Sequence, residues 1–106
     1  MKISKERIVT GVEIRLAEPN GSVPTLTVRA LRRTEAREFL AADFTRQRAL
    51  LLECVRDWSG FQREDGTPLP FSREVLEDAI EDVMLGNAIG EALLAASTGV
   101  GLRKNS

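Results

Sequence analysis

The sequence predicts an α+β domain that is mainly α-helical, with an N-terminal β-hairpin followed by one long amphipathic helix and two shorter helices. Two patterns predict this class. Near the N-terminus apolar residues occupy every second position, which is the period of a strand with one buried face. From residue 35 onwards they recur three, four and seven positions apart, which is the period of an amphipathic helix. We expect a single domain over 1–98 and a flexible tail over 99–106.

The hairpin is expected over about residues 8–31. The segments VEIRL (12–16) and LTVRAL (26–31) both alternate apolar and polar residues. Between them, Asn20 and Gly21 tolerate positive φ and favour a turn. An isolated hairpin is marginal in water, so its apolar face must pack on the helices or on another chain.

The long helix is expected over about residues 35–58, with Thr34 as its N-cap and Gly60 at its end. Trp58 would then lie in the last turn and cover the core. Cys54, on the inner half of the helix, is expected to be a small buried residue and not a nucleophile. The apolar stripe along this helix consists of Ala36, Leu40, Phe44, Leu51, Val55 and Trp58.

The first short helix is expected over about residues 73–85. Ser72 is a good N-cap for it. Phe71 and Leu76 stand at the two positions of a hydrophobic staple, which fixes how the chain enters a helix. Gly86 is expected to end the helix.

The second short helix is expected over about residues 88–97, with Asn87 as its cap. Its apolar residues include Ile89, Leu93 and Leu94. The last eight residues, GVGLRKNS, contain two glycines and no apolar cluster, so we expect this end of the chain to fray.

The composition argues against several classes of function. The formal net charge of −1 gives no reason to expect nucleic acid or an anionic membrane as the partner. No apolar run approaches the roughly 20 residues of a membrane span. The chain has no histidine, the commonest general base and metal ligand, and its single cysteine suits a reducing cytosol. We therefore expect a protein that is not an enzyme, with no catalytic residue, metal or cofactor.

The segment WSGFQREDGTPLPFSREVLE, residues 58–77, joins the long helix to the first short one. A tryptophan and a glycine lead into an acidic turn with two prolines, and a helix with alternating acidic and apolar residues follows. This pattern resembles the signature of tail assembly chaperones of phages and prophages with long non-contractile tails. The wider resemblance covers roughly residues 24–97. The positions that carry it are Trp58, Gly60, Asp65, Gly66, Pro68, Leu69, Pro70, Phe71 and Ser72.

The resemblance implies a binding protein of viral morphogenesis. Members of this family bind the long tape measure protein and keep it soluble while the tail tube assembles. It further implies a homo-oligomer in the host cytoplasm that is absent from the mature virion. The charge and the apolar pattern already predict that neither nucleic acid nor membrane is a partner. Two alternatives stay open: a generic cytosolic protein–protein interaction module, and a structural tail protein retained in the virion.

Many members of the family are also made in a longer form by a programmed frameshift, and the extension binds the tail tube protein. The codons of Lys104 and Asn105 are rich in adenine, so these residues are the candidate frameshift position. The alternative is that this segment is an ordinary polar terminus.

Trp58 and Phe71 are expected to hold two helices together across the proline-containing turn, and also to line the rim of a groove for the partner. The full set of candidates for partner binding or for bracing the loop is Trp58, Phe61, Leu69, Phe71, Leu93 and Leu94.

Overall fold

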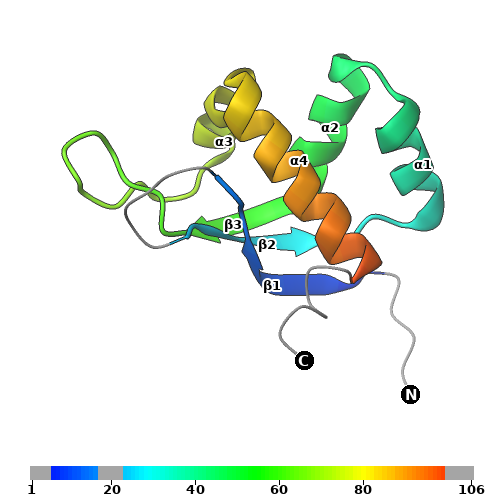
Figure 1. The fold of residues 1–106 in the computed structure, drawn as a ribbon, viewed down its shortest axis with the longest axis horizontal. Helices are drawn as coiled ribbons and strands as arrows, with labels where there is room; N and C mark the ends of the chain where they lie inside the picture. The colour runs from blue at the N-terminus through cyan, green and yellow to red at the C-terminus, as the bar shows by residue number, and fades with distance from the viewer. Residues whose placement is uncertain (1–5, 17–22, 100–106) are drawn as a thin grey trace.

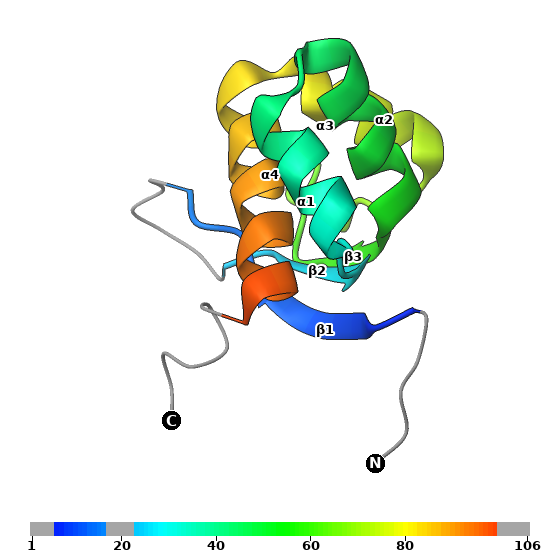
Figure 2. The same ribbon diagram turned by 90° about the vertical axis from the view of Figure 1, so that its right-hand side faces the viewer.

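The computed structural model describes residues 6–16 and 23–99. The described elements are β1 (Ile8–Glu13), β2 (Thr25–Arg29), α1 (Arg33–Ala41), α2 (Phe44–Cys54), β3 (Val55–Ser59), α3 (Arg73–Glu81) and α4 (Val83–Thr98). The strands form one antiparallel sheet in the order β1-β2-β3, and the helices lie together on one side of it (Figures 1 and 2). The predicted α+β class is confirmed, but one long and two shorter helices are replaced by four helices and a third strand.

The predicted hairpin is present and contains a β-bulge. β1 and β2 pair antiparallel, and their register shifts between Val9 and Val12. Gly11 lies in the bulge with a φ of 67°, which glycine adopts without strain. The bulge places Val9 and Val12, three positions apart, on the same buried face. The predicted turn at Asn20 and Gly21 lies outside the described residues.

The chain from Val55 to Ser59 is a strand, so the prediction of one helix that continues to Trp58 is wrong. β3 pairs antiparallel with β2, and Trp58 lies opposite Leu26. The register shifts along this pair as well, so Val55 and Trp58 are both buried although they are three positions apart. The same spacing occurs on one face of a helix, which explains the error.

The predicted long helix also breaks in its middle, at Ala42 and Asp43. Ala42 has an extended backbone, with a ψ of 160°. The Asp43 carboxylate accepts a hydrogen bond from the N–H of Arg46 at 3.1 Å and so caps the start of α2. A capped start stabilises a new helix by about 1 kcal/mol, which favours a corner here over one continuous helix.

A partly buried ion pair fixes the start of α1. The N-cap is Arg32 and not Thr34, and the Glu35 carboxylate accepts a hydrogen bond from the Arg32 N–H at 2.9 Å. The same carboxylate binds the guanidinium of Arg29 on β2 at 2.8 and 3.1 Å. Glu53 on α2 lies 3.3 Å from this guanidinium. Arg29 therefore ties the central strand to both α1 and α2.

The boundary between the last two helices lies earlier in the sequence than predicted, at Asp82. Ser72 caps α3 as expected, since its Oγ accepts a hydrogen bond from the Val75 N–H at 3.1 Å. α3 then ends at Glu81 instead of residue 85. Asp82 caps α4, because its carboxylate accepts from the Leu85 N–H at 2.9 Å.

Gly86 and Asn87 consequently lie inside α4, and the predictions that they end one helix and cap the next are wrong. Gly86 serves the corner in another way. A Cβ at this position would lie 2.6 Å from the carbonyl oxygen of Ile80, so only glycine fits where α4 turns back against α3.

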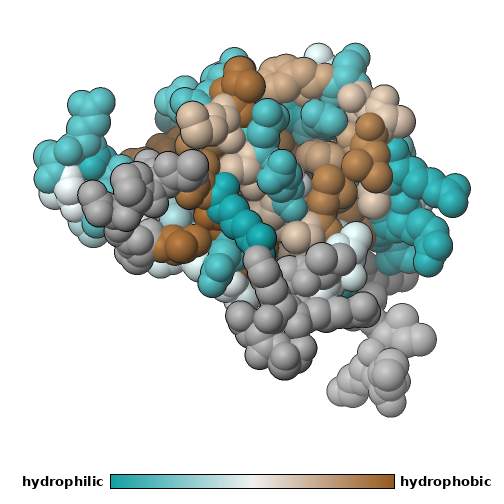
Figure 3. Space-filling model, viewed as in Figure 1, coloured by the Kyte–Doolittle hydropathy of each residue, from teal (hydrophilic) through white to brown (hydrophobic). Residues whose placement is uncertain are grey.

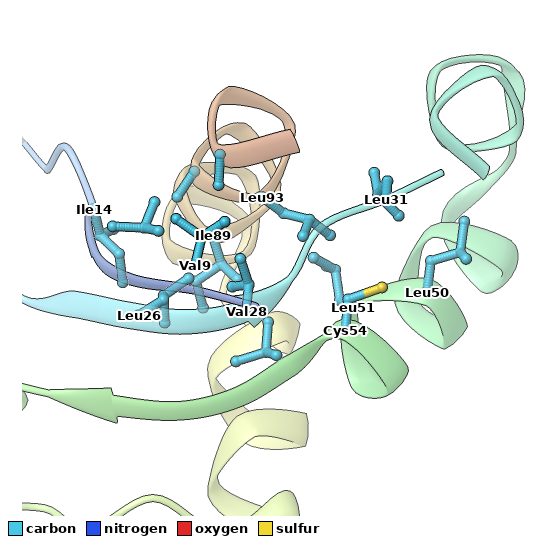
Figure 4. Packing of buried hydrophobic residues seen from close by; sticks show 14 of the residues in the cluster. Val9, Ile14, Leu26, Val28, Leu31, Leu50, Leu51, Cys54, Ile89 and Leu93 are labelled. Atoms are coloured by element: carbon cyan, nitrogen blue, oxygen red, sulfur yellow. The ribbon is translucent and has the colours of Figure 1, made fainter. Parts of the chain in front are cut away.

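The hydrophobic core lies between the sheet and the helices. α4 packs across the sheet, and its fully buried side chains Ile89 and Leu93 point towards Val28 of β2 (Figure 4). The end of α4 is tied down by two hydrogen bonds at Ser97. The Arg7 guanidinium donates to the Ser97 carbonyl oxygen at 2.7 Å, and the Ser97 hydroxyl accepts from the Leu31 N–H at 2.8 Å.

Candidate functional site

A hollow of about 530 Å³ lies between the corner of α1 and α2 and the corner of α3 and α4. We call it the helix groove. This volume is in the range of about 300–1,000 Å³ that is usual for ligand pockets. The α1–α2 wall consists of Phe39, Leu40, Phe44, Gln47, Arg48 and Leu51. The α3–α4 wall consists of Ile80, Glu81, Val83, Gly86, Asn87, Gly90, Glu91 and Leu94.

Large apolar side chains stand on both rims of the helix groove. Leu40 and Phe44 are 71% and 53% exposed on one rim, and Val83 is 77% exposed on the other. Met84, next to Val83, is 68% exposed. Apolar surface gathers over the helical layer and is interrupted by hydrophilic side chains (Figure 3). Exposed apolar surface that is grouped around a hollow is typical of a surface that binds another molecule.

The two helix corners place the exposed side chains. Asp43 caps α2 and Phe44 follows it directly, while Asp82 caps α4 and Val83 follows it directly. In both cases the apolar residue is the first of its helix. The chain has just turned at this position, so the side chain projects from the corner and contributes to the rim.

The floor of the groove is built by close packing. Phe39 on α1 is buried, and its ring lies against α4 at Gly90, where a Cβ would lie 3.1 Å from Cζ of the ring. The Gln47 side-chain amide donates to the Phe39 carbonyl oxygen at 2.8 Å and so holds α1 to α2. Leu51 and Ile80 complete the buried part of the floor.

The charged side chains in the groove are mainly acidic on the α3–α4 side. Arg48 lies 3.5 Å from Glu77 and 4.0 Å from Glu81, so its charge is shared between them. Glu91 is exposed and lines the groove, and no cation of the described chain lies within 4 Å of its carboxylate. The Glu91 carboxylate on the α4 wall can therefore pair with a cation of a bound partner.

Four of the predicted candidates, three aromatic residues and Leu69, form a cluster around Trp58. The Trp58 indole N–H donates to the Leu69 carbonyl oxygen at 2.9 Å. The Phe61 and Phe71 rings lie 4.4 and 5.2 Å from the Trp58 ring, centroid to centroid. Trp58 is buried, and the other three are half-buried. The cluster joins β3 to the loop before α3, and so it does not join two helices as predicted.

The last two candidates, Leu93 and Leu94, lie in different places, because neighbouring residues on a helix point in different directions. Leu93 is fully buried in the core, and Leu94 is half-buried and lines the helix groove. Lys104 and Asn105, the candidate frameshift position, lie outside the described residues.

Sequence reasoning placed Leu40 and Phe44 on a buried stripe and so missed them as rim residues. The signal that could have found them is Asp43, an N-cap residue in the middle of an apparent helix. A helix that restarts there points the apolar residues at the corner outwards. The same signal, Asp82 before Val83, marks the opposite rim.

Three further properties of the described residues bear on function: the reactivity of the thiol, metal binding and membrane spanning. Cys54 is buried, and burial raises the pKa of its thiol to about 11, so it carries no thiolate at neutral pH. Within residues 6–16 and 23–99, no cluster of cysteine, aspartate or glutamate has a geometry that would hold a metal ion. In the same part of the chain, no helix has both the length and the hydropathy of a membrane span.

Comparison of the chain with protein-family models, with curated proteins and with solved structures gives no match. The helix groove and the resemblance of residues 58–77 are therefore the two observations that bear on function.

Proposed function

We propose that this protein is a phage tail assembly chaperone that binds the tape measure protein and keeps it soluble while the tail tube assembles. The observation that carries the proposal is the helix groove, with exposed Leu40, Phe44 and Val83 around an apolar floor. The resemblance of residues 58–77 to the family supports it independently.

The groove suits a helical ligand. Helix-in-groove recognition uses apolar side chains spaced three or four residues apart on one face of the bound helix. A long helical chain presents such faces repeatedly and aggregates when they remain in water. A small protein that covers them in many copies would keep such a chain in solution, and it needs no catalytic group to do so.

The remaining parts of the proposal follow from the same role. The protein acts as a homo-oligomer in the host cytoplasm, leaves before the virion is complete, and binds neither nucleic acid nor membrane. A second, frameshift-extended product that diverges at Lys104 or Asn105 would carry the contact with the tail tube protein.

Co-expression with the tape measure protein tests this function. The fraction of the tape measure protein in the soluble extract is measured alone, with the wild-type chain, and with the double variant Leu40→Glu/Phe44→Glu. Val23→Glu is the matched control, because Val23 is 50% exposed and does not line the groove. We expect the wild type and Val23→Glu to keep the tape measure protein soluble, and the double variant to fail.

Two results would contradict the proposal in different ways. A tape measure protein that stays insoluble with the wild-type chain would overturn the chaperone function itself. A double variant that works as well as the wild type would leave the function in place and remove the helix groove as its site.

A further inference from the structure

The helix groove has two unlike walls, and the difference specifies its ligand further. The α1–α2 segment, residues 33–54, contains four basic and four acidic residues. The α3–α4 segment, residues 73–98, contains six acidic residues and one basic residue. Of the charged residues that line the groove, Arg48 is on the α1–α2 wall, and Glu81 and Glu91 are on the α3–α4 wall. A helix bound between them would therefore meet an acidic surface on the α3–α4 side.

The acidic wall is only partly neutralised from within the groove. Arg48 is the basic residue among those that line it, and this guanidinium already faces Glu77 and Glu81. Glu91 lies farther along α4 and lines the groove with no cation of the described residues within 4 Å. A partner that brings its own positive charge to this wall gains an ion pair at the edge of an apolar contact, where water is partly excluded.

Two of the three exposed apolar residues that line the groove lie on the opposite rim, while the third, Val83, lies on the α3–α4 rim. Leu40 and Phe44 project from the α1–α2 corner, so the apolar face of a bound helix would pack towards α1 and α2. Its flank would then pass along the line of Glu81, Asn87 and Glu91. The apolar contact and the charged contact thus fall on adjacent faces of one ligand helix.

We propose that the helix groove selects amphipathic helices that carry lysine or arginine beside the apolar stripe, and rejects helices that carry glutamate or aspartate there. This inference rests on the proposed function and deepens it, because it names the segments of a partner that the protein binds. The ligand is a helical protein segment with a basic flank.

Three synthetic peptides test the selectivity against the full chain. Each has about 20 residues, which form a helix of about 30 Å, and leucines at positions i, i+3, i+4 and i+7. The flanking positions carry lysine in the first peptide, glutamate in the second and glutamine in the third. Dissociation constants are measured by fluorescence anisotropy of labelled peptides, at low and at physiological ionic strength.

We expect the lysine peptide to bind roughly five- to tenfold more tightly than the glutamate peptide, with glutamine between them. The preference should shrink as salt screens the exposed part of the interaction. The substitution Glu91→Lys should abolish or reverse this order of affinities among the three peptides. The control is Glu64→Lys, the same charge change at an exposed residue of the loop before α3, and it should leave the order intact.

Equal binding of the lysine and glutamate peptides would overturn the inference, and so would equal effects of Glu91→Lys and Glu64→Lys. Failure of every peptide to bind would also overturn it. These outcomes are separate from those of the co-expression experiment. A soluble tape measure protein without peptide selectivity leaves the proposed function standing, and peptide selectivity without a soluble tape measure protein leaves only the groove inference standing.

Discussion

The ion pair between Arg29 and Glu35 is the residue-scale feature that positions a wall of the groove. Arg29 is only 6% exposed, and Glu35 is the first acidic residue of α1. In the alternation of LTVRAL, Arg29 occupies a polar position, which predicts exposure to water. It is buried instead because α1 folds back over it and supplies the carboxylate. Sequence periodicity shows which face a residue is on, and it does not show what later elements cover that face.

The pH dependence of stability should report this pair. The hydrogen bond from Arg29 lowers the pKa of Glu35, and the Arg32 N–H lowers it further. Since the folded pKa lies below the unfolded value of about 4.3, the stabilisation is complete above that value and is lost as the pH falls through the folded pKa. Glu35→Gln should therefore cost about 2 kcal/mol at pH 7 and much less near pH 3.

Urea unfolding of the wild type and Glu35→Gln at the two pH values measures the difference. Arg29→Met provides the control background, because without the guanidinium the effect of Glu35→Gln should depend much less on pH, with Arg32 alone left to lower the pKa of Glu35. A cost that stays the same at both pH values in the wild-type background would show that Glu35 acts through packing and not through its charge.

At the scale of elements, the β-bulges explain what the sequence could and could not predict. The first hairpin was predictable because strict alternation at Val12 and Ile14 has no helical interpretation. β3 was not, because its bulge buries Val55 and Trp58, which are three positions apart and continue the stripe of α2. An apolar pattern at helical spacing is ambiguous wherever a strand contains an extra residue.

Two glycines of α4, one turn apart, give a matched pair of substitutions. In Gly86→Ala the new Cβ meets the Ile80 carbonyl oxygen at 2.6 Å, and a backbone atom cannot move aside without opening the corner. In Gly90→Ala the Cβ meets the Phe39 ring at 3.1 Å, and a ring can shift by a few tenths of an ångström. Alanine also gains about 1 kcal/mol of helix propensity at both positions.

We expect Gly86→Ala to destabilise the protein by about 2–3 kcal/mol and Gly90→Ala to stay within about 1 kcal/mol of the wild type. The free energy of unfolding is measured in urea, with Trp58 fluorescence as the signal. If both variants lose the same free energy of unfolding, then the Phe39 ring on α1 yields as little to a new Cβ as the backbone of Ile80 on α3 does. That result would contradict the expectation that the Phe39 ring shifts to accept the new Cβ.

At the scale of the whole molecule, the class of the fold and the main apolar positions follow from the sequence, and the site does not. The Ser72 cap and the buried positions Leu26 and Val28 of the hairpin could be placed by local rules of capping and periodicity. The helix groove arises where two corners face each other, Asp43–Phe44 from one part of the chain and Asp82–Val83 from another. No local sequence pattern predicts that these two corners face each other, because their relative position depends on how α1 and α2 pack against α4.

Stability measurements separate the rim of the groove from the core. Leu40→Glu/Phe44→Glu should unfold within about 1 kcal/mol of the wild type, because both side chains are already exposed to water. Leu93→Ala should lose about 2–5 kcal/mol, because it leaves a cavity in the core. The comparison is made by urea unfolding at equal protein concentration. A loss in the rim variant as large as that in Leu93→Ala would indicate that a second copy covers the groove in the free protein.

The position of α4 has a consequence for the order in which the chain can fold during synthesis. The sheet that α4 covers begins at residue 8, and the bonds at Ser97 join the end of α4 to Arg7 and Leu31. The apolar face of β1 and β2 therefore has no cover until nearly all of the described chain has left the ribosome. Native contacts between such distant residues form late and slowly. The nascent chain consequently passes through a stage in which a protein proposed to shield the apolar surface of others exposes its own.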